Sequence, residues 1–543
     1  MEVPLQSFVQ PQGQASASDD ASAALLPAPA PVVPRPLARI GAVLRRPFML
    51  DLRALALMRM AVAAIILVDL AIRSTDLEAH YTNLGVLPLH VLFERAWNPY
   101  QFSLHTMSGL WEVQALLFAL AAALAVGLLL GWRTRWMTLG SWLLLVSLQN
   151  RNPLIAQGGD DLLRMLLFWG LFLPWGRVWA KDARELPAPA HYSCFGVATA
   201  AFVVQVALVY VCTAFLKNAP EWTTEGTAIY YALSLDQVLM PAGRLLYPHY
   251  ELMRWLTHFT YYTELLLPIL LFMPVATNTC RLLFVLVLFG FHAGISLTLF
   301  VGLFFLISFA ALLGLLPTPA MNWLEARLGP AVQLGAAHLA RWREQLPVWQ
   351  TPLQVELRLA LHPRVPQHRH FRLLPALRDT VLLVLLGYVV WWNLDGIVTP
   401  RYGMGEPLRW FGYLFRTDQH WGMFAPAVFK DDGWYILEGS TRDGRLLDLY
   451  RGGRRVSYAK PASIMALHKN DRWRKYSENY LFVDNDWMRA YYCNYMLRVW
   501  HDNPKNPPLT HLNVVYMKEV SLPHYRVQGP SREVLCGCDA PPR

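Results

Sequence analysis

Long apolar runs alternate with short polar segments along most of this chain. A helix needs roughly 20 apolar residues to cross the hydrocarbon core of a bilayer, so each long run predicts a membrane-spanning helix. We place nine candidate spans at residues 55–72, 113–131, 136–149, 161–175, 195–217, 252–274, 281–299, 302–317 and 377–398. The pattern predicts a membrane all-α protein, a polytopic bundle of about nine transmembrane helices.

The pattern changes after residue 398. Residues 399–543 contain short runs rich in β-branched and aromatic residues, separated by turn signals such as Asp443-Gly444. The segment Tyr435–Tyr450 predicts a hairpin around that turn. With helix expected around 471–501, this region predicts a small β-rich (α+β) domain.

Three further segments complete the expected organisation. Residues 1–45 form an Ala/Pro-rich leader without the apolar core of a signal peptide, and we expect it to be disordered. Residues 46–317 hold the main bundle, and 318–376 form a basic loop that leads to the last helix at 377–398.

Composition and charge support a membrane protein. Hydrophobic residues make up 55% and charged residues 16% of the chain, against about 25% charged in an average soluble domain. The net charge of +10 comes from Arg and Lys in loops between apolar runs, which argues against a nucleic-acid partner and for a lipid bilayer.

The basic loops also predict orientation, because cytoplasmic loops carry the excess of Arg and Lys. Basic and non-basic loops alternate from the leader onward, so we expect a cytoplasmic N-terminus. Nine spans then put residues 399–543 outside. For a bacterial source this means a multi-pass inner-membrane protein with a periplasmic C-terminal domain.

The six cysteines predict no metal centre. Cys194, Cys212 and Cys280 lie in or beside apolar runs, and no spacing typical of zinc ligands occurs. Cys493, Cys536 and Cys538 lie in the polar tail, where one disulfide can form if the tail is extracytoplasmic.

Lys217 is the first of several ionisable residues in or near the predicted spans. Such residues are costly in lipid and are functional candidates by default. Tyr210, Thr213 and Lys217 share one helix face. A buried Lys217 could serve as a neutral base, whereas a lysine that snorkels to water would have no further role.

Two histidines lie deeper. His258 is one helical turn from Tyr262 and about 120° round the helix from Glu264, and His292 lies inside the seventh span. For His258 the alternative is a hydrogen-bonded interior cluster, and for His292 it is a packing role.

Other polar residues cluster at the ends of predicted spans. Asp160 and Asp161 can cap the fourth helix and pair with Arg164, a structural alternative to a binding role. Arg59 and Asp69 in the first span are expected to pair with partners on other helices, and Asp69 can also reach Arg73. We expect an outward-opening polar pocket with candidate substrate-binding residues near the outer face, namely Asn150, Arg151, Asp160, Trp222 and Glu225, together with Tyr210, Tyr262 and Glu264 from the helices.

Several of these residues belong to two sequence motifs. The segment Lys217-Asn-Ala-Pro-Glu-Trp222-Thr-Thr-Glu225-Gly226 and the spacing Phe291-His292-x3-Ser296-x5-Gly302-x-Phe304 resemble the vitamin K-dependent γ-glutamyl carboxylase family. The segments Thr82–Pro88 and Gly158-Gly159-Asp160 resemble its bacterial branch, the HTTM-domain proteins. The resemblance covers about residues 50–317, with one extra residue between Trp222 and Gly226.

This resemblance implies a function. The family uses reduced vitamin K as its quinol cofactor, oxygenates it to an epoxide, and carboxylates a peptide glutamate. It implies Lys217 as the initial base, with His292 and His258 at the reaction site. A Glu-containing peptide or protein would be the substrate.

A fold can be kept without its reaction. The alternative is a non-catalytic membrane scaffold, or a transporter, that retains the HTTM bundle. An unpaired Lys217 lying in water, with His258 and His292 on different faces, would favour that alternative.

Overall fold

A computed structural model describes residues 36–344, 373–397 and 403–540. The chain divides into a short N-terminal unit, Met1–Leu44, and a main unit, Arg45–Arg543. Most of the expected disordered leader, residues 1–35, lies outside the described residues, but Pro36–Arg45 forms helix α1.

Five described helices are long and apolar enough to cross a membrane. They bury apolar faces against one another and leave others exposed, as lipid-facing helices do. These helices are α2 (Leu52–Ser74), α5 (Trp111–Leu130), α8 (Val197–Leu216), α13 (Thr277–Thr298) and α17 (Leu373–Asp395).

A sixth candidate is broken. Helix α14 (Phe304–Leu313) meets α15 (Thr318–Glu344) at a bend of 103°, so the pair is either one broken span or a segment that turns back. The expected basic loop at 318–376 begins as α15, and its residues 345–372 lie outside the described part. Ala, Leu, Glu and Arg are good helix formers, which explains the helix at 318–344.

The expected count of nine spans is not confirmed. Three expected spans correspond to α6 (Thr134–Arg151), α7 (Gly158–Gly170) and α12 (Tyr250–Leu266), which are too short or too polar to meet the same criterion. Helix α7 has 13 residues, a length of about 20 Å, against about 30 Å for a bilayer core. Eleven of those residues are buried, because α7 packs inside the bundle.

Contacts between helix ends show which helix ends lie together at each end of the bundle. At the first, Leu50 before α2 pairs with Cys194 before α8, and Arg281 near the start of α13 donates to the carbonyl of Met49. The short strands there are β1 (Leu50–Asp51) and β2 (Ser193–Cys194). At the second, Arg73 at the end of α2 pairs with Asp160 at the start of α7.

The region after α17 contains a five-stranded antiparallel sheet in the order β5-β4-β3-β6-β7. Its strands are β3 (Asp431–Thr441), β4 (Leu446–Asp448), β5 (Arg454–Arg455), β6 (Leu509–Leu522) and β7 (Arg526–Asp539). The predicted hairpin is confirmed: β3 pairs with β4, with Ser440 opposite Leu446 and the Asp443-Gly444 turn between them.

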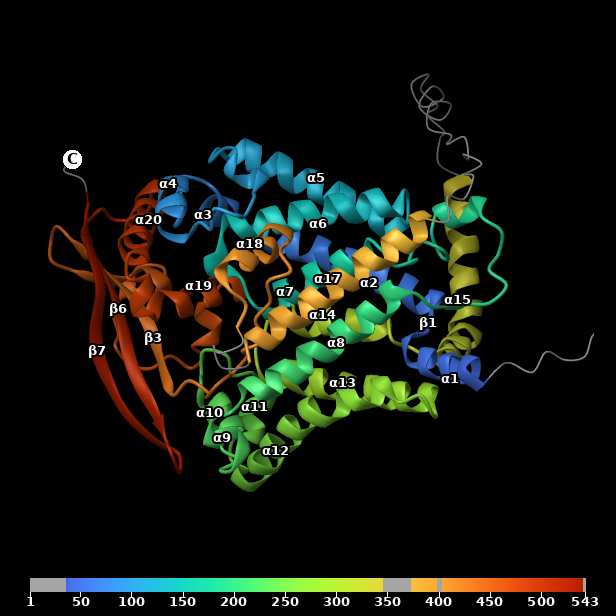
Figure 1. The fold of residues 1–543 in the computed structure, drawn as a ribbon. Helices are drawn as coiled ribbons and strands as arrows, with labels where there is room; N and C mark the ends of the chain where they lie inside the picture. The colour runs from blue at the N-terminus through green and yellow to red at the C-terminus, as the bar shows by residue number, and fades with distance from the viewer. Residues whose placement is uncertain (1–35, 345–372, 398–402, 541–543) are drawn as a thin grey trace, which may run out of the picture. The chain divides into compact units, whose positions relative to one another are not determined.

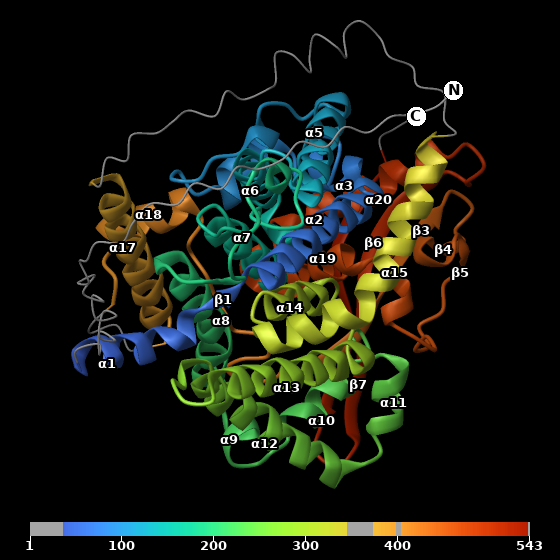
Figure 2. The ribbon, with the colours of Figure 1, turned by 90° about the vertical axis from the view of Figure 1, so that its right-hand side faces the viewer.

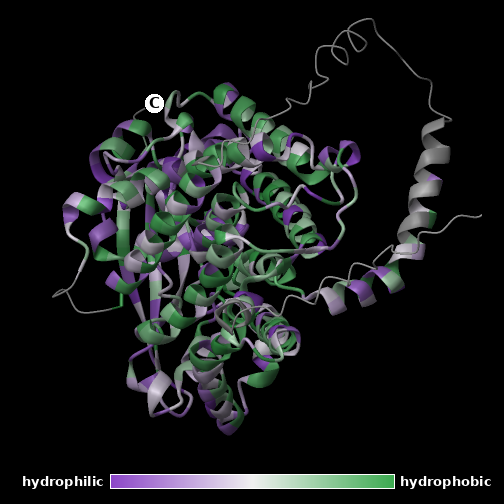
Figure 3. Ribbon diagram, turned by 45° about the vertical axis from the view of Figure 1, so that its right-hand side comes forward, coloured by the Kyte–Doolittle hydropathy of each residue, from purple (hydrophilic) through white to green (hydrophobic). Residues whose placement is uncertain are grey.

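Three helices accompany the sheet, namely α18 (Glu406–Phe415), α19 (Asp471–Leu481) and α20 (Met488–Asp502). The last two confirm the helix expected around 471–501. Within the main unit, α19 lies between the strands and the bundle (Figures 1 and 2). Hydrophobic residues run along much of the helical part in Figure 3.

Short helices connect the long ones. The bundle loops contain α3 (Leu77–Tyr81), α4 (Leu89–Val91), α9 (Pro220–Thr223), α10 (Ala228–Ser234) and α11 (Pro241–Leu246). Three of them, α9 to α11, lie in the connection from α8 to α12 and carry the segment that follows Lys217.

Candidate functional site

Lys217 directly follows helix α8 and forms a buried ion pair. Its Nζ lies 2.6 Å from Oε2 of Glu264 on α12, and the two side chains are only 4% and 7% exposed. Two charges removed from water need each other, because either one alone would be strongly disfavoured. The alternative of a lysine lying unpaired in water is therefore wrong.

Trp222 covers this pair. Pro220 starts the four-residue helix α9, which places the Trp222 ring centroid 4.2 Å from the ammonium of Lys217. The indole N–H donates to the carbonyl of Phe424 at 2.9 Å, so a loop from the region after α17 fixes the ring. The ammonium is held by a carboxylate and by the negative face of an aromatic ring.

Tyr210 and His292 form a second polar contact in the bundle. Tyr210 on α8 and His292 on α13 meet through the phenol oxygen and Nε2 at 2.9 Å, and both are buried. Phe304 packs against the imidazole with ring centroids 5.6 Å apart. Among the described residues, the buried Nδ1 of His292 has no hydrogen-bond partner.

The two contacts share helix α8 but lie apart along it. Tyr210 and Lys217 are seven residues apart, which is about 10 Å of helix rise. The sequence placed both on one face, and their inward-facing partners agree with that placement. The structure therefore brings Lys217, Glu264 and Trp222 together, with Tyr210 and His292 as a neighbouring pair.

His258 does not join the Lys217 pair. Its ring lies against Gly226, where an added Cβ would be 2.7 Å from Nε2, and Gly226 has φ +71°. Because His258 and Glu264 are about 120° apart round α12, only Glu264 faces Lys217. The Gly226 of the sequence pattern is needed both for its backbone conformation and for this close approach.

Tyr262 and Glu225 also lie outside the cluster. Tyr262 is 51% exposed and contacts the ring of Tyr261. Glu225 is exposed, and its carboxylate accepts a hydrogen bond from Thr227. The side chains of these residues therefore do not form the single pocket that we expected.

Asn150, Arg151 and Asp160 have other partners as well. Arg151 donates to the carbonyls of Leu87 and Thr82 at 2.9 and 3.2 Å, which fixes the Thr82–Pro88 segment. Asn150 donates to the carbonyl of Phe102 at 2.8 Å and accepts from Arg416. These residues lie at the bundle end that meets the C-terminal region, where they fix loops and do not contact Lys217.

Asp160 belongs to a buried network of four charges. It caps α7 through the backbone N–H of Gln157, as predicted, and pairs with Arg73 and Arg472. The predicted pairing of Asp69 with Arg73 is confirmed at 2.7 Å, and Arg164 pairs with Asp161. Arg59, for which we expected a charged partner, instead donates to backbone carbonyls, including that of Trp175.

Sequence reasoning missed Arg472 entirely. It comes from α19, and its guanidinium reaches Asp69 at 2.7 Å inside the bundle. One signal existed: two buried carboxylates, Asp69 and Asp160, had only Arg73 as a predicted cation nearby. The missing positive charge had to come from another part of the chain.

A further charged cluster connects the sheet to the bundle. Lys460 Nζ lies 2.6 Å from Glu519, 2.7 Å from Asp236 and 3.7 Å from Asp432. Asp432 is 2% exposed, and its burial, reinforced by the charge of Asp236, raises the pKa of this carboxyl to about 7.

No metal centre is found in the described ranges, where no group of three or more His, Cys, Asp or Glu side chains could hold an ion. Comparisons with protein-family models, with curated proteins and with solved structures give no match.

Proposed function

We propose that this protein is a multi-pass membrane enzyme that oxygenates a lipophilic quinol, with Lys217 as its base. The observation that supports this most is the burial of the Lys217 amine between Glu264 and the ring of Trp222, at 2.6 and 4.2 Å. The vitamin K-dependent carboxylase resemblance of the sequence assigns the same lysine.

The pair has the acid–base capacity that the proposal needs. An amine can take a proton only in its neutral form, and Glu264 is within hydrogen-bond distance to receive the proton that Lys217 gives up. Glu264 then acts as a positioning residue, because it holds the amine in place at the end of α8 and exchanges a proton with it.

We propose that these residues hold an aromatic diol. When bound, a vitamin K-type quinol would supply an acidic hydroxyl and an oxidisable ring. The buried ring of Trp222 would be an aromatic neighbour for the diol, 4.2 Å from the amine, and Lys217 would be the proton acceptor. The unpartnered Nδ1 of His292 offers a further hydrogen-bonding atom deeper in the bundle. His258 is outside this set.

The peptide substrate follows from the resemblance. We propose a peptide glutamate as the acceptor of carbon dioxide, approaching from the end of the bundle where Lys217 lies. The loop at Phe424, which belongs to the region after α17, already contacts Trp222 there. A peptide held by that region would lie close to the base.

The topology belongs to the same proposal. We propose that α6, α7, α12 and α14 are short crossings, which gives nine crossings with the five apolar ones. The contacts of helix starts and ends at two opposite sites support this alternation. The N-terminus is then cytoplasmic and residues 399–543 are periplasmic, at a bacterial inner membrane.

The disulfide supports that orientation. Cys493 of α20 and Cys538 of β7 are bonded, and disulfides persist in oxidising compartments such as the periplasm.

One observation favours the second candidate, a non-catalytic scaffold or transporter. The Lys217–Glu264 and Asp69–Arg73–Asp160–Arg472 charges are mutually satisfied inside the protein, as in a purely structural bundle. The two candidates differ in whether a substitution at Lys217 changes chemistry or only stability.

The test uses the full-length protein in detergent with reduced vitamin K, oxygen, labelled bicarbonate and a Glu-containing peptide. We expect the wild type to form the epoxide, Lys217→Ala to lose it, and label to enter the peptide. Arg254→Ala is the matched control, because it removes an exposed positive charge close to the loop that contains Glu225. Equal epoxide formation by Lys217→Ala would contradict the assignment of the base, and absence of turnover with the wild type would favour the scaffold.

A further inference from the structure

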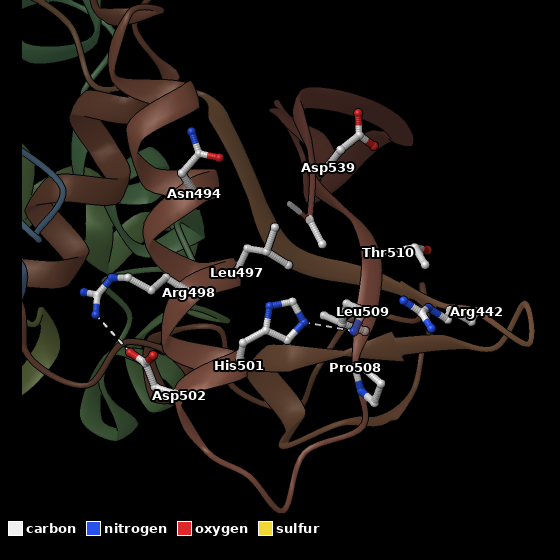
Figure 4. Close-up of a pocket in the computed structure, with 11 residues that line it drawn as sticks. Arg442, Asn494, Leu497, Arg498, His501, Asp502, Pro508, Leu509, Thr510 and Asp539 are labelled. Atoms are coloured by element: carbon white, nitrogen blue, oxygen red, sulfur yellow. Dashed lines mark hydrogen bonds and ion pairs between the residues drawn. The ribbon is translucent and has the colours of Figure 1, made fainter. Parts of the chain in front are cut away.

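The C-terminal region contains a surface hollow of about 490 Å³, which we call the α20 hollow. Figure 4 shows its two sides, helix α20 on one and the ends of β6 and β7 on the other. It is lined by Arg442, Asn494, Leu497, Arg498, His501, Asp502, Pro508, Leu509, Thr510, Asp539 and Ala540. Its volume is within the range of small-molecule sites, about 300–1,000 Å³.

The walls of the α20 hollow are firmly connected. The Cys493–Cys538 disulfide ties α20 to β7 immediately beside the lining residues. The backbone N–H of Leu509 donates to Nε2 of His501 at 3.0 Å, and that of Ala540 donates to the carbonyl of Thr510 at 2.9 Å. Because the walls are already ordered, binding of a ligand does not have to pay the entropy cost of ordering them.

Most charges that line the hollow already have partners. Arg498 pairs with Glu78 and with Asp502, the latter at 2.9 Å. Asp539 pairs with His511 at 2.7 Å. Within the described residues, Arg442 has neither an ion pair nor a side-chain hydrogen bond, although the neighbouring Arg445 pairs with Asp443 at 2.6 Å.

We propose that the α20 hollow binds a carboxylate on a short apolar stem, with Arg442 as the residue that recognises the charge. The guanidinium at the rim offers a planar pair of donors that matches a carboxylate. The floor beside it is apolar, since Leu497 and Leu509 are buried and Pro508 adjoins them. This site is separate from Lys217 and does not depend on the function proposed for it.

The charge of the ligand is limited by the same lining. Asp502 and Asp539 keep carboxylates in the wall, so a doubly charged phosphate would meet more repulsion than a single carboxylate does. A neutral amide of the same shape would leave Arg442 without a charged partner. The free monocarboxylate butyrate and a glutamate side chain in a peptide both present the required chemistry.

Binding to the full-length protein in detergent is measured by ligand-observed NMR. The probes are acetyl-Ala-Glu-Ala-amide, its Gln counterpart, butyrate and inorganic phosphate. We expect the Glu peptide to bind, and the Gln peptide and phosphate to bind at least about tenfold more weakly. Butyrate should also bind, because it is a single carboxylate on a short apolar stem.

Three variants localise the site. Arg442→Ala is expected to weaken binding of the Glu peptide about tenfold, and Asn494→Trp, at an exposed lining position, to block the hollow without disturbing the core. Arg445→Ala, three residues from Arg442 and already paired, is the matched control and should bind like the wild type. Equal affinity for the Glu and Gln peptides, or unchanged binding in both Arg442→Ala and Asn494→Trp, would overturn the proposal.

Discussion

Arg472 donates to both carboxylate oxygens of Asp160, at 2.6 and 3.0 Å, across 312 residues of sequence. The same guanidinium reaches Asp69 at 2.7 Å, so a helix of the C-terminal region completes a neutral network inside the bundle. With Arg73, the four side chains are almost entirely buried. The C-terminal region is therefore part of the bundle's electrostatic balance.

Substitution of Arg472 tests that balance. Arg472→Met leaves two buried carboxylates with Arg73 alone, and we expect a loss of about 3–5 kcal/mol in the free energy of unfolding. Chemical unfolding in detergent, followed by tryptophan fluorescence, measures this loss. Arg254→Ala, which breaks an exposed pair with Glu251, should cost about 0–1 kcal/mol, and a similar cost at Arg472 would contradict the network.

A double-mutant cycle separates the structural role of the Lys217–Glu264 pair from its chemistry. Lys217→Met and Glu264→Leu each leave an uncompensated buried charge, which costs about 3–5 kcal/mol. The double variant should be more stable than the sum of the single effects predicts, because it removes both charges. Additive losses in the unfolding free energy would mean that the 2.6 Å contact contributes no coupling.

The stability of the folded protein should depend on Asp432 between about pH 4 and 7. Burial raises the pKa of Asp432 to about 7 from the usual 3.8, so the folded state holds a proton that the unfolded state has released. This contribution is fully present below pH 4 and is lost as the pH rises through 7.

The measurement compares thermal unfolding midpoints at pH 5 and pH 8. The wild type should lose more stability than Asp432→Asn as the pH rises, because the amide cannot ionise. Asp431→Asn changes the adjacent, half-exposed residue that pairs with Lys518 and should follow the wild type. An identical pH profile for Asp432→Asn and the wild type would exclude Asp432 as the titrating group.

Removal of the disulfide should weaken the C-terminal region. Cys493 and Cys538 are 45 residues apart, and closure of a loop of that length stabilises a fold by about 4 kcal/mol. Cys538→Ser should therefore lower the unfolding midpoint, as reductant should for the wild type. Cys536→Ser removes a cysteine outside the bond and should have little effect on the unfolding midpoint. Mass spectrometry of the cysteine-containing peptides identifies which cysteines are bonded in each variant.

Much of the fold was predictable from short stretches of sequence. Apolar runs such as 55–72 and 195–217 predicted the helices α2 and α8. Whether about 20 consecutive residues are apolar enough to enter lipid depends only on those residues themselves. The Asp443-Gly444 turn and its flanking strand patterns predicted the β3–β4 hairpin for a similar reason. The local spacing of Asp69 and Arg73 predicted their ion pair.

The candidate site was predictable only in part. The sequence identified Lys217, Glu264, Tyr210 and His292 as polar residues on inward helix faces, but it could not tell which would meet. Helix rotation decides that, so Glu264 reaches Lys217 while His258 lies against Gly226. Asn150, Arg151 and Asp160 were grouped with the site by their position at one bundle end, although their partners lie elsewhere.

The sequence by itself determined where apolar segments, turns and ionisable groups occur, since hydropathy and turn propensity depend on neighbouring residues. Only the tertiary structure decided which short helices are covered by protein, that Cys493 pairs with Cys538, and that Arg472 neutralises Asp69 and Asp160. Those outcomes depend on contacts between segments far apart in the chain. A buried charge or thiol selects its partner by proximity in space, and the folded chain alone sets that proximity.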